Sequence, residues 1–298
     1  MTPTDPPILS PASRASWRTV LGEAGPLILP AAHDALTARL IARAGFRAYQ
    51  VGGFALAGSR YAYPDIDLVH YYEENEAIRQ IVAASPLPVV VDGGNGFGDV
   101  KSVTRTVRGY EELGIAAIFI EDQTSPITCG QMGKREVVSI REMVGKVGAA
   151  LAARRNADTF VIARTDGRSA KGVDEAIRRG EAYREAGADG LYIEGLRSVA
   201  ELKRVGKALA GTPLATTMME GGGQMEWVSP DEIREAGFAM IMYPTTLLFQ
   251  ITKALERALS NLKAGKPMAQ KDAMNLDAFE DIVGLTSWRA IEEKFGVK

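Results

Sequence analysis

The segment PLPVVVDGGNGFGDV, residues 86–100, changes character halfway along its length. Its first half is a short apolar run rich in valine, and its second half contains four glycines together with aspartate and asparagine. A run of this length without period-two alternation is typical of a strand that is covered on both faces. We therefore predict a buried strand that ends at Asp92 and continues into a loop whose backbone approaches a ligand or another segment.

Apolar runs of the same kind alternate with helical patterns along most of the chain. The eight runs occupy residues 26–32, 48–53, 88–94, 116–122, 159–166, 190–195, 213–217 and 238–244. Several of the intervening helical patterns end in glycine just before the next run, which is a common way for a helix to close. Strands that alternate with helices form a parallel sheet, and eight such units predict a (β/α)₈ barrel of the TIM type. A doubly wound open sheet is the alternative.

The same pattern divides the chain into a barrel domain, residues 1–264, and a C-terminal helical extension, residues 265–298. The segment YPTTLLFQITKALERALSNL, residues 243–262, has the apolar spacing of an amphipathic helix. More apolar side chains follow it in the extension. They cover either their own barrel or a neighbouring subunit, and both options stay open at this point.

Composition narrows the classes of partner. The 298 residues include 35 Lys and Arg against 37 Asp and Glu, without a basic run, so we expect no nucleic-acid or membrane partner. The one cysteine, Cys129, excludes an internal disulfide and is typical of a reducing, cytoplasmic location. The first residues lack the pattern of a secretory signal, and no segment has the roughly 20 apolar residues of a membrane span. A small molecule is the expected partner.

Polar residues gather where the predicted strands end. They are His33, Asp34, Asp92, Glu121, Asp122, Arg164, Asp166, Glu194, Thr216 and Thr217. In a parallel barrel these ends meet at one face, where active sites lie. Carboxylates from separate strands suit a hard divalent cation such as Mg²⁺, and Asp92 and Glu121 are the best candidates. Arg164 offers a planar fork for a substrate carboxylate, so the pattern predicts a site for a small carboxylic acid.

Two features of the loops leave alternatives open. The glycines of GGNGFG, residues 93–98, would let backbone N–H groups approach an anion, although the segment matches neither the dinucleotide fingerprint nor a P-loop. A plain turn is the other interpretation of this segment. Cys129 lies in a polar loop after the fourth predicted strand, where it is either a small buried hydrophobic residue or a proton-transfer group.

Several segments resemble the isocitrate lyase and phosphoenolpyruvate mutase superfamily, most closely its 2-methylisocitrate lyase branch. They include VGGFALAGSRYAYPDIDL (51–68), VDGGNGFGDV (91–100), IEDQTSPITCG (120–130), IARTDG (162–167) and EAGADGLYIEG (185–195). The glutamate followed eight residues later by cysteine is the spacing of the carbon–carbon lyases. The resemblance implies Mg²⁺, with Mn²⁺ as an alternative, and 2-oxo or 2-hydroxy carboxylic acid substrates. It also implies a homotetramer in which the last helix of the barrel is exchanged between subunits.

Matched position by position, the resemblance implies roles for individual residues. Asp92 matches the direct metal ligand, and Glu121 matches a ligand that acts through metal-bound water. Asp65 matches an aspartate that closes over the substrate, and Cys129 matches the acid that protonates the departing carbanion. The positions that match substrate-binding residues are Gly52, Gly53, Arg164, Glu194, Thr217 and Glu220.

The chain also departs from the family pattern. The departures are Val51 for serine, Gly94 for aspartate, Asn95 for threonine, Ile127 and Thr128 for a basic pair, Gln131 for histidine, and Thr217 for asparagine. One anionic metal contact is therefore missing at Gly94. The missing basic groups would hold the second carboxylate arm of a tricarboxylate, so the departures favour a different substrate.

The leading hypothesis is a Mg²⁺-dependent carbon–carbon lyase. It would cleave a 2-hydroxy di- or tricarboxylic acid by retro-aldol chemistry into a 2-oxo acid and a second carboxylate. The alternatives within the superfamily are an oxaloacetate-type 2-oxo acid hydrolase or decarboxylase and a phosphoenolpyruvate mutase-like enzyme. A non-catalytic metabolite-binding homologue is the alternative of a different class.

Overall fold

Eight parallel strands form a nearly closed barrel in the computed structural model, which describes residues 14–129, 132, 135–222, 225–269 and 273–296. The strands follow the order β1-β8-β7-β6-β5-β4-β3-β2, and a bridge between Ala31 and Gln50 brings β1 to β2. They are β1 (Leu27–Pro30), β2 (Tyr49–Val51), β3 (Val89–Asp92), β4 (Ala117–Glu121), β5 (Phe160–Thr165), β6 (Gly190–Ile193), β7 (Leu214–Thr217) and β8 (Met240–Tyr243). Consecutive strands are neighbours around the sheet, which confirms the predicted (β/α)₈ barrel and excludes the doubly wound alternative.

The strands are buried on both sides, as their continuous apolar runs predict. Val90 and Phe119 belong to the cluster inside the barrel, whereas Val89 and Val91 belong to the cluster between the strands and the helices. Trp17 of helix α1 (Trp17–Leu21) is fully buried in the inner cluster. β3 ends at Asp92, and the glycine loop that follows it stays buried through residues 93–96.

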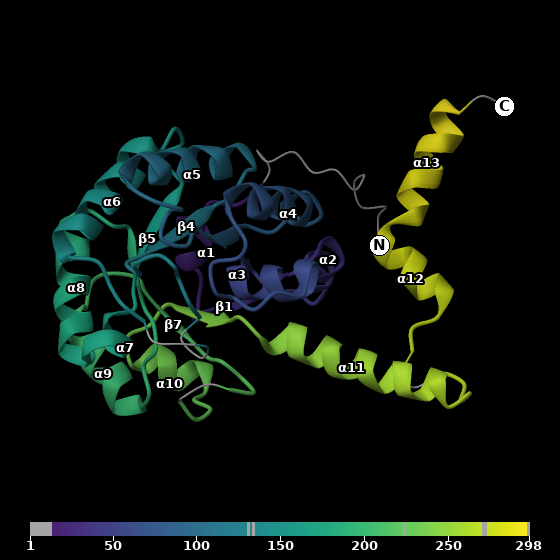
Figure 1. Cartoon of the computed structure of the whole chain (residues 1–298). Helices are drawn as coiled ribbons and strands as arrows, with labels where there is room; N and C mark the ends of the chain where they lie inside the picture. The colour runs from purple at the N-terminus through teal and green to yellow at the C-terminus, as the bar shows by residue number, and fades with distance from the viewer. Residues whose placement is uncertain (1–13, 130–131, 133–134, 223–224, 270–272, 297–298) are drawn as a thin grey trace.

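Helices surround the barrel in Figure 1. Besides α1 they are α2 (Ala35–Arg43), α3 (Gly53–Leu56), a π-helical turn η2 (Ala57–Tyr61), α4 (Tyr71–Ala83), α5 (Val100–Glu112), α6 (Ile140–Ala153), α7 (Gly167–Lys171), α8 (Val173–Glu185), α9 (Val199–Ala208) and α10 (Pro230–Glu235). Local sequence sets several of their ends. Asp99 caps α5 and Ser139 caps α6 by accepting backbone hydrogen bonds, and Gly114 and Gly187 leave their helices with positive φ. Within the described ranges, no helix has the length and apolar content of a membrane span.

The C-terminal helices extend away from the barrel as an arm (Figure 1). The arm consists of α11 (Thr246–Lys263), α12 (Leu276–Val283) and α13 (Leu285–Phe295). No residue of α11 is buried, although Phe249 in its first turn contacts the ring of Phe54. α12 returns to α2, where Arg39 Nη1 donates a hydrogen bond of 3.0 Å to the Ile282 carbonyl. The exchange of a helix between subunits and the domain boundary at residue 264 stay predictions.

Candidate active site

A cleft opens at the carboxyl-terminal ends of the strands, and most of the predicted site residues meet there. Those that line it are Gly52, Gly53, Asp65, Asp92, Glu121, Cys129, Arg164, Glu194 and Thr217. Glu220 does not line this cleft. Its carboxylate accepts a hydrogen bond of 2.5 Å from Thr246 at the start of α11, and it borders a separate pocket with Met219 and Trp227.

Asp92 and Glu121 stand at the ends of two adjacent strands, β3 and β4. Asp92 Oδ1 accepts a hydrogen bond of 2.9 Å from the backbone N–H of Gly94, and its Oδ2 accepts one of 3.3 Å from that of Gly53. Glu121 Oε1 accepts from Gln123 Nε2 at 3.0 Å, while its Oε2 lies 3.2 Å from Arg164 Nη2. The two carboxylates are thereby fixed on one wall of the cleft.

The acids of this wall have raised pKa values. Burial raises the pKa of Glu121 to about 8, and Asp166 and Asp92 add to the shift while Arg164 opposes it. Burial followed by the charge of Asp92 raises the pKa of Asp65 to about 6. Burial raises the pKa of Asp92 as well. A cation in the cleft would relieve this repulsion.

Asp92 and Glu121 suit Mg²⁺ by donor chemistry. In the part of the chain that the structure describes, no group of three or more His, Cys, Asp or Glu is arranged to hold a metal ion on its own. Mg²⁺ keeps several waters and commonly uses only one or two protein carboxylates, so a pair of acids with excess negative charge fits this ion. The pair does not make the closed set of ligands that a dehydrated metal would need.

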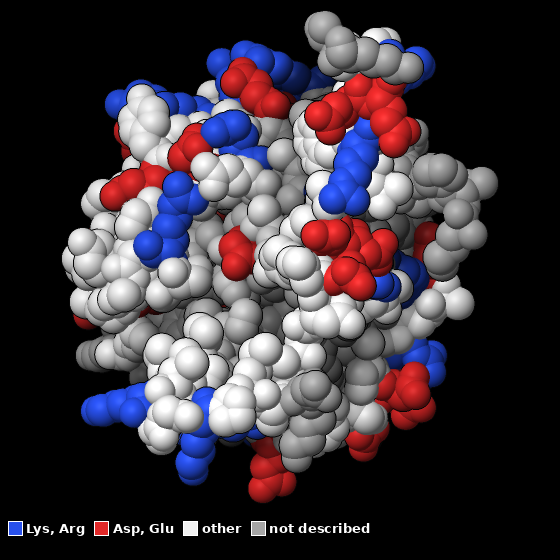
Figure 2. All heavy atoms as spheres, turned by 90° about the vertical axis from the view of Figure 1, so that its right-hand side faces the viewer, with Lys and Arg blue, Asp and Glu red and all other residues white. Residues whose placement is uncertain are grey.

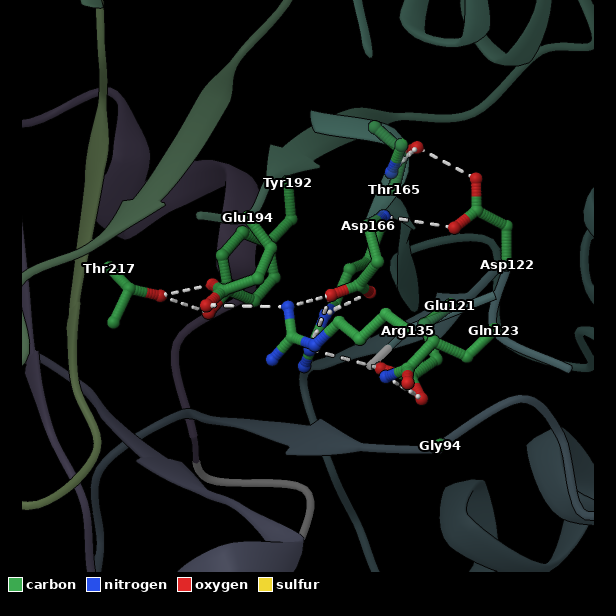
Figure 3. A network of polar contacts seen from close by, with 12 residues as sticks. Gly94, Glu121, Asp122, Gln123, Arg135, Thr165, Asp166, Tyr192, Glu194 and Thr217 are labelled. Carbon is green, nitrogen blue, oxygen red and sulfur yellow. Dashed lines mark hydrogen bonds and ion pairs between the residues drawn. The ribbon is translucent and has the colours of Figure 1, made fainter. Parts of the chain in front are cut away.

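Two arginines share the buried carboxylate of Asp166 next to Glu121. Figure 3 shows Arg135 beside Asp166 and Glu121. Arg164 Nε lies 3.0 Å from Asp166 Oδ2, and Arg135 Nη1 pairs with Asp166 Oδ1. Arg135 Nη1 is also 3.8 Å from Glu194 Oε1. The guanidinium of Arg164 lies over the ring of Tyr192, 5.2 Å from its centroid. The guanidinium groups of Arg135 and Arg164 therefore line the cleft, which suits a carboxylate ligand.

Thr217 orients the carboxylate of Glu194. Its Oγ1 donates a hydrogen bond of 2.6 Å to Glu194 Oε2 and also contacts the hydroxyl of Tyr192 (Figure 3). Thr217 and Glu194 come from the ends of different strands, β7 and β6 respectively. A hydroxyl at position 217 therefore fixes one rotamer of the carboxylate that faces the arginines.

Cys129 is tied to the segment that carries Asp65. Its backbone N–H donates a hydrogen bond of 3.0 Å to the Asp65 carbonyl. The N–H of Ile127 donates to Asp67 Oδ2 at 3.2 Å, and that of Thr128 donates to Gln123 Oε1 at 3.2 Å. The cysteine and the closing aspartate of the family pattern therefore lie on two loops that are joined directly. The departure at Gln131 lies outside the described residues.

Some polar residues at the strand ends serve the scaffold instead. Asp34 caps α2, and the hydroxyl of Thr37 is 3.2 Å from His33 Nε2. Asp122 is fully buried away from the cleft, where Thr165, Arg179 and Tyr183 hydrogen-bond to it. The expectation that all these residues form one ring is wrong for Asp122, because successive side chains of a strand point to opposite faces.

Glu74 and Arg135 also line the cleft, although nothing in the sequence pattern singles them out. Glu74 lies in the first turn of α4, where acids are common because they favour the helix dipole, so nothing local distinguishes it. Arg135 follows the cysteine loop in the segment GKREVVS, residues 133–139. This segment lies between a predicted strand and a predicted helix, so no apolar periodicity indicates which way the Arg135 side chain points.

The sequence matches a known enzyme family and several lyases. The phosphoenolpyruvate phosphomutase family matches residues 18–263. The chain is 38% identical over 283 residues to 2,3-dimethylmalate lyase of Eubacterium barkeri, covering 94% of this chain and 97% of that protein. It is 36% identical over 247 residues to 2-methylisocitrate lyase of Bacillus subtilis (strain 168), covering 83% and 80%.

Solved structures of related enzymes superpose on most of the chain. Oxaloacetate acetylhydrolase in complex with the inhibitor 3,3-difluorooxalacetate matches with a TM-score of 0.88 at 27% identity, over 94% of this chain and 96% of that one. Phosphonopyruvate hydrolase in complex with oxalate and Mg²⁺ matches with a TM-score of 0.81 at 29% identity, over 90% and 94%. The chain belongs to the phosphoenolpyruvate phosphomutase family and is an enzyme of the isocitrate lyase and phosphoenolpyruvate mutase superfamily, as its motifs predict.

Proposed function

We propose that the protein is a Mg²⁺-dependent carbon–carbon lyase that cleaves a 2-hydroxy di- or tricarboxylic acid into a 2-oxo acid and a second carboxylate. The observation that carries the proposal is the single cleft lined by Asp92, Glu121, Arg164 and Cys129. The relatives named as lyases, which match the chain over most of its length, support it.

Each residue of the cleft has a proposed part in the reaction. Asp92 and Glu121 would hold Mg²⁺, or Mn²⁺ in its place, and the bound ion would polarise the substrate oxygen that becomes the carbonyl. Arg164 grips the carboxylate of the forming 2-oxo acid, and the backbone at Gly52 and Gly53 approaches its other end.

Bond cleavage is a retro-aldol step. A carboxylate of the cleft takes the proton of the substrate hydroxyl, the C–O bond becomes a carbonyl, and the electrons of the broken C–C bond pass to the enolate of the second product. Cys129 donates its thiol proton to that enolate carbon, and Asp65 covers the substrate from the adjoining loop. Glu194, held by Thr217, orients the substrate.

A panel of 2-hydroxy di- and tricarboxylates, with oxaloacetate included, tests the proposal. We expect one member to release a 2-oxo acid in a reaction that chelator and Asp92→Ala abolish, while Asp174→Ala, at an exposed carboxylate, leaves the rate unchanged. Chromatographic identification of both products separates the options. Chelator-resistant turnover, or no turnover on any member, would contradict the proposed lyase.

An oxaloacetate-type hydrolase or decarboxylase is the second candidate. Ile127 and Thr128 line the cleft in place of the basic pair of the lyases, which favours a smaller acid with fewer carboxylates. The similarity to oxaloacetate acetylhydrolase supports the same candidate. Formation of oxalate and acetate, or of CO₂, from oxaloacetate would favour it over the lyase, and a rearranged phosphonate from phosphoenolpyruvate would favour a mutase.

We also propose a homotetramer in which the arm packs on a second copy. The arm exposes apolar side chains along α11, namely Ile251, Leu255, Leu259 and Leu262, with Leu255 57% exposed. Figure 2, turned toward this side of the molecule, shows uncharged surface between scattered acidic and basic groups. Light scattering should give the mass of four chains for the wild type and a smaller mass for Leu255→Asp. A monomeric wild type would contradict this assembly.

We propose a cytoplasmic location on the basis of the single cysteine, which leaves the chain without an internal disulfide. Fractionation of cells that express the full chain tests it. Recovery of the protein outside the cytoplasmic fraction would overturn the proposal.

A further inference from the structure

We propose that Glu74 supplies the metal site with the negative charge that position 94 lacks, acting through metal-bound water from helix α4 rather than from the β3 loop. The inference rests on the metal-binding part of the proposed function. It does not depend on which acid the enzyme cleaves.

Three carboxylates converge on the backbone at Gly53. A Cβ built on Gly53 would lie 3.5 Å from Glu74 Oε1, 3.8 Å from Asp92 Oδ2 and 3.9 Å from Asp65 Oδ1. Glu74 reaches this point from the first turn of α4, and both Asp92 and Glu74 line the cleft. Glu74 is therefore placed beside the direct ligand that the family pattern assigns to the metal.

The partners of Glu74 leave one of its oxygens available. Its Oε2 accepts a hydrogen bond of 3.3 Å from the hydroxyl of Tyr110, whereas its Oε1 accepts none from the residues that the structure describes. Only 8% of the residue is exposed. Because Glu74 lines the cleft, its Oε1 can accept a hydrogen bond from a water molecule there.

The charged groups nearest to Glu74 are also acidic. Asp92 and Asp65 are the acidic groups that face Glu74 here. Glu74 is thus surrounded by acids at the point where the cleft needs a counter-ion. A divalent cation with its water shell would offset the charge of all three carboxylates.

An outer position for Glu74 agrees with the geometry. Within the described ranges no three acidic, histidine or cysteine side chains are arranged to bind one ion directly. Mg²⁺ retains several waters, and carboxylates that bind such waters tune the affinity of the site. Glu74 is therefore assigned to the water shell and not to the direct ligands.

Position 94 has room for the residue that it lacks. A Cβ on Gly94 would meet only the Ile127 side chain, at 3.5 Å, which is ordinary contact. Gly94 has φ +50°, a region in which any side chain is strained, although aspartate tolerates it better than most residues. Gly94→Asp can therefore return a carboxylate to the loop and replace the contribution of Glu74.

Calorimetric titration of the metal-free full chain with MgCl₂, and separately with MnCl₂, tests the inference. We expect Glu74→Gln to raise the Kd by about 10- to 100-fold, the usual effect of losing such an outer partner. The double variant Glu74→Gln with Gly94→Asp should recover most of the affinity. Glu76→Gln, at an exposed acid on the same helix, is the matched control and should leave the Kd unchanged.

The inference is overturned by unchanged affinity in a folded Glu74→Gln variant, by failure of Gly94→Asp to recover the loss, or by a wild type that binds neither ion. Circular dichroism and thermal unfolding check the fold of each variant, and Glu74→Met provides a second uncharged replacement if Gln does not fold. Metal binding with these responses but without lyase turnover would leave the inference intact and reject only the proposed reaction.

Discussion

Glu121 and Asp122 are neighbours in the chain, yet they belong to two different regions of the barrel. Glu121 faces the cleft, where Gln123 and Arg164 contact it while Asp166 and Asp92 add negative charge nearby. Asp122 faces helix α8 and accepts hydrogen bonds from Thr165 Oγ1 at 2.7 Å, Arg179 Nη1 at 2.9 Å and Tyr183 Oη at 2.7 Å. Burial raises the pKa of both carboxyls, but the donors around Asp122 offset part of its shift.

The difference separates two uses of a buried carboxylate. At Asp122 the protein supplies the donors, so the charge joins two strands to a helix and needs no ligand. In the cleft, burial raises the pKa of Asp65, Asp92 and Glu121, so a metal ion beside them would favour their ionised forms. Substitutions in the first region should therefore affect folding, and substitutions in the second should affect chemistry.

Asp92→Asn should have the largest effect on turnover. We expect kcat/KM to fall by roughly 10⁴-fold, since metal polarisation contributes several kcal/mol to the barrier and about 1.4 kcal/mol corresponds to a tenfold change. Steady-state release of the 2-oxo acid measures it. The melting temperature of the metal-free variant should change less than that of Asp122→Asn, and a large drop would place Asp92 with the structural carboxylates.

Cys129→Ala should come next. Loss of a positioned proton donor typically costs about 10²- to 10⁴-fold, so kcat should fall on that scale while circular dichroism stays unchanged. Cys129→Ser, which keeps a weaker donor of similar size, is the matched comparison and should retain more activity than alanine. Full activity of Cys129→Ala would show that another group protonates the enolate.

Asp122→Asn should lower the free energy of unfolding by about 3–5 kcal/mol, because it leaves Arg179 buried without its anionic partner. Denaturant unfolding in the presence of chelator measures the change. The kcat of the folded fraction should fall far less than in Asp92→Asn. Equal loss of activity in the two variants would remove the distinction between the regions.

The pH dependence of stability should be the smallest effect. The pKa of Glu121 is about 8 in the folded protein against an ordinary value of 4.5, so between these values the folded state binds a proton that the unfolded state has lost. Raising the pH through this window should therefore destabilise the metal-free protein, by up to about 1.4 kcal/mol per pH unit for one such group.

The comparison with Glu121→Gln isolates this contribution. Between pH 6.5 and 8 the wild type should lose more unfolding free energy than the variant, and saturating Mg²⁺ should reduce the difference. Parallel curves for the two proteins would mean that Glu121 is not the acid that titrates in this window.

Much of the fold and of the site follows from the sequence because the signals are local. Eight apolar runs separated by helical patterns predict the barrel, and each run contains a strand. The ends of those runs also place Asp92, Glu121 and Arg164 at one face, since all strands of a parallel barrel end on the same side. Family motifs then identify Asp65 and Cys129, which lie on loops beyond the strand pattern.

The tertiary structure alone decided which charges are buried and what they face. Glu73 and Glu74 are adjacent, yet Glu73 accepts a hydrogen bond of 2.8 Å from the N–H of His70 at the helix start, while Glu74 turns into the cleft. Long-range packing likewise places Arg135 in the cleft and Glu220 outside it. Successive residues of a helix point about 100° apart, and which direction is buried depends on segments far away in the chain. Local pattern therefore fixes the elements, whereas long-range packing fixes the electrostatics of the site.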